Sequence, residues 1–82
     1  MKQREKADEE FLKTLGARIA AIRKSKGVTQ VELSYRCDIE KSNMRRIEAG
    51  NTNVTVLMLR KVCGALDIPL GDLFGVESES AK

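Results

Sequence analysis

The 82 residues of this chain suffice for one small domain and fall well short of the length at which a soluble protein splits into two cores. Apolar residues make up 41% and charged residues 33%, a globular composition. Only three aromatic side chains are available to fill a core, Phe11, Tyr35 and Phe74, so we expect aliphatic packing between close helices. The formal net charge of +3 favours a polyanionic partner.

Several kinds of chemistry lack the residues that they need. Histidine, the commonest general base and metal ligand, is absent. Cys37 and Cys63 are too few for a closed zinc site, which takes four ligands, and we interpret both as buried core thiols. Paired carboxylates and a glycine-rich phosphate loop are also missing. We therefore expect no enzyme, no metal, no cofactor and no small-molecule ligand.

No apolar run approaches the roughly 18 residues that span a bilayer, and the charged start does not resemble a signal peptide. We expect a cytoplasmic protein without a membrane partner.

Hydrophobic periodicity predicts five short helices and therefore an all-α fold. The first helix is expected over residues 8–26, with Gly27 ending it. Its apolar side chains recur every three or four residues and should face the core: Phe11, Leu15, Ile19 and Ile22.

The second and third predicted helices are joined by a tight turn. Thr29 is a good N-cap for the second helix, and Glu32 completes a capping box three residues later. This helix should end at residue 37 or 38. The third helix is expected over residues 41–49, where Gly50 terminates it.

The fourth helix is predicted over residues 55–66, with Asn53 or Thr55 as its cap, and a brief fifth helix starts at Pro69 and ends at Phe74. One folded domain between two solvated tails accounts for the whole chain: residues 8–76, flanked by 1–7 and 77–82.

The third helix has two chemically different faces. At about 100° per residue, Met44 and Ile47 share one arc, and the opposite arc carries Lys41, Ser42, Arg45 and Arg46. Charge on a helix face is often merely solvated, but residues 13–46 contain nine basic residues against three acidic ones. A helix of this kind fits the major groove of B-DNA, about 12 Å wide, where Arg can donate a bidentate pair to guanine.

Motifs along most of the chain occur in the order found in a known family. They are Ile22-Arg23, Gly27-Val28-Thr29-Gln30, Glu32-Leu33, Ile39, Ile47-Glu48-Ala49-Gly50, Leu59 and Ala65-Leu66-Asp67-Ile68. Over residues 15–74 the chain resembles the Xre family of helix-turn-helix proteins, the lambda repressor and Cro class. In size it also resembles stand-alone phage repressors and restriction-modification controller proteins. The resemblance implies a compact five-helix domain with the helix-turn-helix at the second and third helices.

The resemblance also implies roles for individual residues. Lys41, Ser42 and Arg46 match positions that reach base edges, and Arg45 is a further candidate for a base or the backbone. Gln30 matches a glutamine that binds a DNA phosphate, the alternative being a solvated residue of the first turn. Asn51 and Asn53 match positions near the sugar-phosphate backbone, with a plain turn role as the alternative. Arg23 and Glu48 match a structural ion pair.

Two residues of the turn depart from the family pattern. Asp38 stands where Gly is usual, and Asp tolerates a positive φ better than most residues with a side chain. Glu40 stands where Ser or Thr usually caps the recognition helix, and Glu is a weaker cap that brings negative charge near phosphate.

One short recognition helix reads few base pairs, so we expect a homodimer on a pseudo-palindromic operator with half-sites about 34 Å apart. We expect the two copies to meet through four apolar residues of the C-terminal part, Leu70, Leu73, Phe74 and Val76. The alternative is that all four close the core of the monomer. The alternative function is an antitoxin-type module that binds DNA together with a partner protein. Repression and activation both stay open.

Overall fold

Four α-helices and one 3-10 helix make up the part of the chain that the computed structural model describes, residues 5–74. In chain order they are α1 (Lys6–Ser25), α2 (Gln30–Cys37), α3 (Lys41–Ala49), α4 (Val56–Leu66) and η1 (Leu70–Phe74). No strand occurs between residues 5 and 74, so the prediction of an all-α fold is confirmed.

The fifth predicted helix is corrected to a single 3-10 segment. This segment has five residues. At its start the Asp72 N–H donates a hydrogen bond to the Pro69 carbonyl at 3.0 Å, and this bond spans three residues, as in a 3-10 helix, rather than the four of an α-helix. The domain therefore has four α-helices, and η1 serves as a closing turn.

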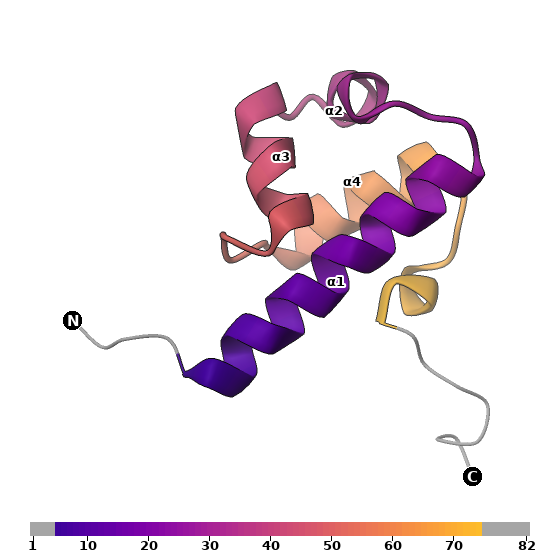
Figure 1. Cartoon of the computed structure of the whole chain (residues 1–82). Coiled ribbons are helices and arrows are strands. Elements are labelled where there is room, and N and C mark those ends of the chain that lie inside the picture. The colour runs from indigo at the N-terminus through magenta and orange to yellow at the C-terminus, as the bar shows by residue number, and fades with distance from the viewer. Residues whose placement is uncertain (1–4, 75–82) are drawn as a thin grey trace, which may run out of the picture.

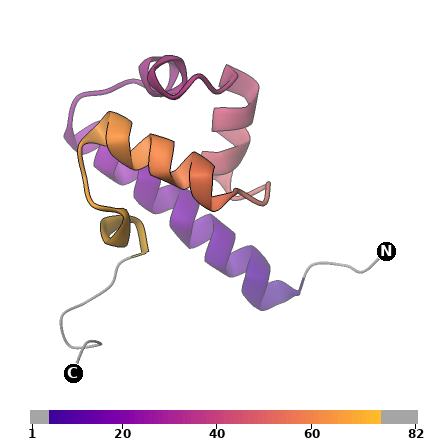
Figure 2. The same ribbon diagram turned by 180° about the vertical axis from the view of Figure 1, so that it is seen from behind.

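The helices pack as a small bundle in which α1 is the longest element (Figure 1). Helix α3 packs on α1, and α2 packs on both α3 and α4. The view from behind shows α4 in front of α1, with η1 beside one end of the pair (Figure 2). Since η1 contacts both α1 and α4, it fixes the C-terminal edge of the domain to the bundle.

The core is aliphatic with two cysteines and one methionine, as expected for a chain with so few aromatic residues. Its members are Leu15, Ile19, Val28, Leu33, Cys37, Ile39, Met44, Ile47, Leu59, Val62, Cys63, Leu66 and Leu73. Phe11 was predicted on the core stripe of the first helix, and that prediction is wrong because its side chain is 56% exposed. It lies on the N-terminal part of α1, which extends beyond the other helices (Figure 1).

Helix ends follow local chemistry. The Thr29 hydroxyl accepts the Glu32 N–H at 3.0 Å, and the Glu32 carboxylate accepts the Thr29 N–H at 3.0 Å, which confirms the capping box. Thr55 rather than Asn53 caps α4, because its hydroxyl accepts the Met58 N–H at 3.1 Å.

Helix α1 starts at Lys6, two residues before the predicted start, so Lys6 and Ala7 belong to the helix and not to a tail. The rest of the predicted N-terminal tail up to Arg4, and the whole of the C-terminal tail, lie outside the described residues. No helix within residues 5–74 is long and apolar enough to cross a membrane.

Candidate nucleic-acid interface

The turn between α2 and α3 is three residues long and is held by one unusual backbone conformation. Asp38 has φ 57° and ψ 43°, in the left-handed region, and closes α2 as its C-cap. The next residue, Ile39, is buried and donates its backbone N–H to the Ser34 carbonyl at 2.9 Å. Asp38 therefore adopts the positive φ predicted for it, and two helices joined in this way form a helix-turn-helix.

Helix α3 is anchored by its apolar arc and presents its polar arc to solvent. Met44 and Ile47 are 0% and 3% exposed, whereas all four predicted base-contacting side chains are exposed: Lys41, Ser42, Arg45 and Arg46. Within residues 5–74, none of these four side chains is held by an intramolecular hydrogen bond or salt bridge. Their donors are therefore available to an external acceptor.

The start of α3 carries the weak cap that the sequence indicates. Glu40 has extended backbone angles, φ −62° and ψ 146°, and its side chain makes no capping hydrogen bond. Its carbonyl accepts the Met44 N–H at 2.9 Å, so the helix still begins at Lys41.

Arg23 and Glu48 form the ion pair that the resemblance implies. Arg23 donates through Nε to Glu48 Oε2 at 2.7 Å and through Nη2 to Glu48 Oε1 at 3.0 Å. The two side chains are only 9% and 7% exposed. The third guanidinium nitrogen, Nη1, donates to the Val28 carbonyl at 2.9 Å. This bidentate pair ties α1 to the C-terminal turn of α3.

Gln30 is the first residue of α2 and is not simply solvated. Its side-chain Nε2 donates to Glu48 Oε1 at 2.9 Å, and the residue is partly exposed. Sequence reasoning identified Gln30 and Glu48 separately and missed the contact between them, because they come from different helices and lie 18 residues apart.

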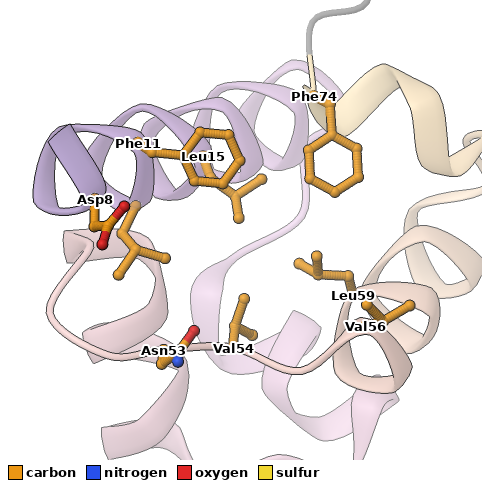
Figure 3. A pocket seen from close by; sticks show the side chains of 9 residues that line it. Asp8, Phe11, Leu15, Asn53, Val54, Val56, Leu59 and Phe74 are labelled. Carbon is orange, nitrogen blue, oxygen red and sulfur yellow. The ribbon is translucent and has the colours of Figure 1, made fainter.

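Asn51 and Asn53 are both exposed in the loop between α3 and α4. Asn51 donates its backbone N–H to the Arg46 carbonyl at 2.9 Å, which keeps it next to the recognition helix. Asn53 lies farther along the loop and lines a pocket together with Asp8 of α1 (Figure 3). Asn51 is thus bonded through its backbone to α3, whereas Asn53 lies near the start of α1.

The four residues predicted to form a dimer contact have different surroundings. Leu73 is 1% exposed and belongs to the monomer core, so its assignment to an interface is corrected. Leu70 and Phe74 are 37% and 42% exposed. Val76 lies outside the described residues.

Phe74 stacks on Phe11, a residue that sequence reasoning had placed in the core. Their ring centroids are 6.3 Å apart with an interplanar angle of 16°. Both rings line the pocket that Asp8 and Asn53 also line, which has a volume of about 370 Å³ and lies between α1, η1 and the start of α4 (Figure 3). Val54 of the loop and Val56, the first residue of α4, also line this pocket, and Val56 is 67% exposed.

Both cysteines are buried in the core, and burial raises the pKa of each thiol. The neutral thiol is therefore favoured, which suits a packing role rather than a nucleophile. Between residues 5 and 74 no three potential ligands among His, Cys, Asp and Glu come together around a metal-sized site.

Comparison with known proteins agrees with this geometry. A family model described as a helix-turn-helix domain matches residues 14–74. The chain is 37% identical over 65 residues to the immunity repressor protein of Bacillus phage phi105, and the match covers 79% of this chain and 45% of that repressor. The chain thus spans less than half the length of this relative.

Solved structures of two regulators have the same fold. The restriction-modification controller protein C.AhdI from Aeromonas hydrophila is 32% identical with a TM-score of 0.75, and the match covers 77% of this chain and 96% of the controller. The clp gene regulator ClgR from Corynebacterium glutamicum is 30% identical with a TM-score of 0.74, over 77% of this chain and 82% of ClgR. The chain belongs to the Xre-type helix-turn-helix family, whose members are DNA-binding regulators of transcription.

Proposed function

We propose that this protein is a sequence-specific regulator that binds double-stranded DNA with α3 in the major groove. The observation that carries the proposal is the division of α3. Met44 and Ile47 anchor the helix in the core, while its basic and hydroxylic arc is exposed and unoccupied by other described side chains. Regulation of transcription would place the protein in the cytoplasm. Its proposed activity is DNA binding and not catalysis.

Two groups of residues have different proposed roles. The exposed arc of α3 would contact base edges through Lys41, Ser42, Arg45 and Arg46, because all four side chains are exposed on the side of the helix opposite its buried arc. The DNA backbone would be contacted by Gln30, Asn51 and Asn53, which fix the register of the helix without reading sequence.

We further propose that two copies bind a pseudo-palindromic operator. One short recognition helix contacts few base pairs, and two-fold symmetry doubles the site. The pocket between α1 and η1 supports this proposal, since the Phe11 and Phe74 rings that line it are exposed at the surface of a small domain. Leu70 of η1, which does not line the pocket, is exposed as well. A second copy would cover them in a symmetric contact.

The test is selection of bound sequences from a randomised duplex pool, with the affinities of the selected duplexes followed across salt concentration. We expect an enriched inverted repeat whose half-sites lie about 34 Å apart, centre to centre. Arg46→Ala serves as the matched control, because it should bind weakly without enriching the same repeat.

Other results would contradict the proposal in distinct ways. Salt-sensitive binding without an enriched motif would reduce the basic arc to an electrostatic anchor. An enriched motif that appears only together with a copurifying protein would favour the antitoxin-type module. An enriched single half-site would remove the homodimer while retaining sequence-specific binding.

A further inference from the structure

The Glu48 carboxylate collects hydrogen bonds from two other helices. Its Oε2 accepts Arg23 Nε at 2.7 Å, and its Oε1 accepts both Arg23 Nη2 at 3.0 Å and Gln30 Nε2 at 2.9 Å. The Glu48 side chain is only 7% exposed, so one nearly buried group on α3 joins α1 and the first residue of α2.

Arg23 fixes the carboxylate, and the carboxylate fixes the orientation of the Gln30 amide. Three Arg23 donors are engaged, two on Glu48 and one on the Val28 carbonyl, so the guanidinium plane is held on both sides. An ionised carboxylate only accepts hydrogen bonds. The nitrogen of the Gln30 amide must therefore face Glu48, and one of its two N–H groups is used there.

The second N–H of Gln30 Nε2 is left for another acceptor. Gln30 is partly exposed at the start of α2, where the first backbone N–H groups of a helix have no intrahelical partner. A phosphate oxygen is an acceptor as well, so it would bind an amide that presents N–H and would be repelled by one that presents its carbonyl oxygen.

We infer that Glu48 is a positioning residue for DNA-backbone recognition: it holds the Gln30 side chain so that an N–H points to a phosphate oxygen of the bound duplex. Arg23 locks Glu48 in place and cancels its negative charge, which would otherwise repel the same phosphate. This inference rests on the proposed function and adds a role that a purely structural tie between α1 and α3 does not have.

The test compares the effect of Gln30→Ala in two backgrounds of the full chain. One is the unmodified protein and the other is Arg23→Met/Glu48→Met, which removes both charges together and so leaves no buried charge stranded and no change in net charge. We expect Gln30→Ala to weaken binding of the selected duplex roughly three- to tenfold in the first background. In the second it should change affinity less than about 1.5-fold, because the amide is no longer oriented.

Arg46→Ala in the same two backgrounds is the control for a merely structural role. If the ion pair only placed α3, its removal would change the effects of Arg46→Ala and Gln30→Ala together. We expect Arg46→Ala to cost the same factor in both. An equal cost of Gln30→Ala in the two backgrounds, or a changed cost of Arg46→Ala, overturns the inference. Should the double-Met background fail to fold, Arg23→Leu/Glu48→Leu replaces it, since it also removes both charges together and leaves no acceptor for the Gln30 amide.

Nuclear magnetic resonance of the DNA-free protein tests the orientation without relying on DNA binding. Gln30 and Gln3 are the two glutamines of the chain, so Gln30→Ala assigns the side-chain signals. We expect one Nε2 proton of Gln30 to be shifted and slow to exchange, and to lose both properties in Arg23→Met/Glu48→Met. Absence of such a proton overturns the inference even if the protein binds DNA. A protein that shows it and selects no duplex would instead contradict the proposed function, and with it the phosphate contact.

Discussion

Gly16 of α1 lies directly against the backbone of Glu48 at the end of α3, so a Cβ on Gly16 would stand 2.4 Å from the Glu48 carbonyl oxygen. The same Cβ would stand 2.4 Å from the Ile47 carbonyl oxygen. Backbone oxygens cannot move aside as a flexible side chain can. The absence of a side chain at Gly16 is therefore what allows the recognition helix to sit this close to α1.

We predict that Gly16→Ala lowers the free energy of unfolding by about 1–3 kcal/mol, because α1 and α3 must separate to admit the methyl group. Urea denaturation measures the change. Gly64→Ala is the matched control: Gly64 lies inside α4 with nothing within 4 Å of an added Cβ. It should gain about 0.5–1 kcal/mol from the better helix propensity of Ala. Equal effects of the two substitutions would contradict the steric argument.

Asp38→Gly should stabilise the domain by about 0.5–1 kcal/mol, because glycine occupies the left-handed conformation of the turn without a steric cost. Thermal denaturation gives the shift. Asp67, the C-cap of α4 with φ 58°, offers an independent repeat of the same chemistry, and Asp67→Gly should gain a similar amount. A loss of stability in Asp38→Gly would mean that the aspartate side chain contributes more than its backbone strain costs.

Glu40→Ser should stabilise the start of α3 by about 0.5–1 kcal/mol, since Ser can accept an N–H of the first turn and Glu40 makes no such bond. It should also tighten DNA binding, because a negative charge next to the recognition helix is removed. Glu40→Gln separates the two effects: it removes the charge without adding a good cap, so affinity should rise while stability does not. Urea denaturation and titration with the selected duplex give both quantities.

Arg46→Ala should weaken specific binding by about 1–3 kcal/mol and leave the midpoint of urea unfolding unchanged, because the side chain is exposed and reaches out from α3. The loss should be concentrated at one base pair of the operator, which a panel of single-base variants reveals. Arg60→Ala, an exposed arginine on α4, is the control and should bind nearly as the parent does. An unchanged preference among operator variants would remove Arg46 from base readout.

Phe11→Ser and Phe74→Ser should each raise the dissociation constant of the proposed dimer at least about tenfold, because the stacked rings of α1 and η1 are exposed together. Sedimentation equilibrium measures the constant. Tyr35→Ser serves as the control, since Tyr35 is 86% exposed on α2 and does not line the pocket. If both phenylalanine variants associate as the parent does, another surface makes the dimer.

The sequence alone determined the local features of the helix-turn-helix. The capping box at Thr29, the bounds of α3 and its termination by Gly50 follow from residues within one turn of each other. The positive φ of Asp38 follows from the resemblance, because the family usually has Gly at that position. The amphipathic division of α3 follows from helical periodicity in the same way. Such features are local because a cap, a turn residue or a helix face depends on neighbours in the chain.

Tertiary structure decided what distant segments do to one another. Helical spacing gives Phe11 and Leu15 the same face, yet only Leu15 is covered, because α1 extends past its partners at the N-terminal end. Leu73 is buried in the core and Phe74 is exposed, because the packing of η1 on α1 and α4 determines which side chain faces inward. The bond from Gln30 to Glu48 joins two helices across 18 residues. Burial and pairing of this kind depend on which helix faces meet in space, and that is settled only when the whole domain packs.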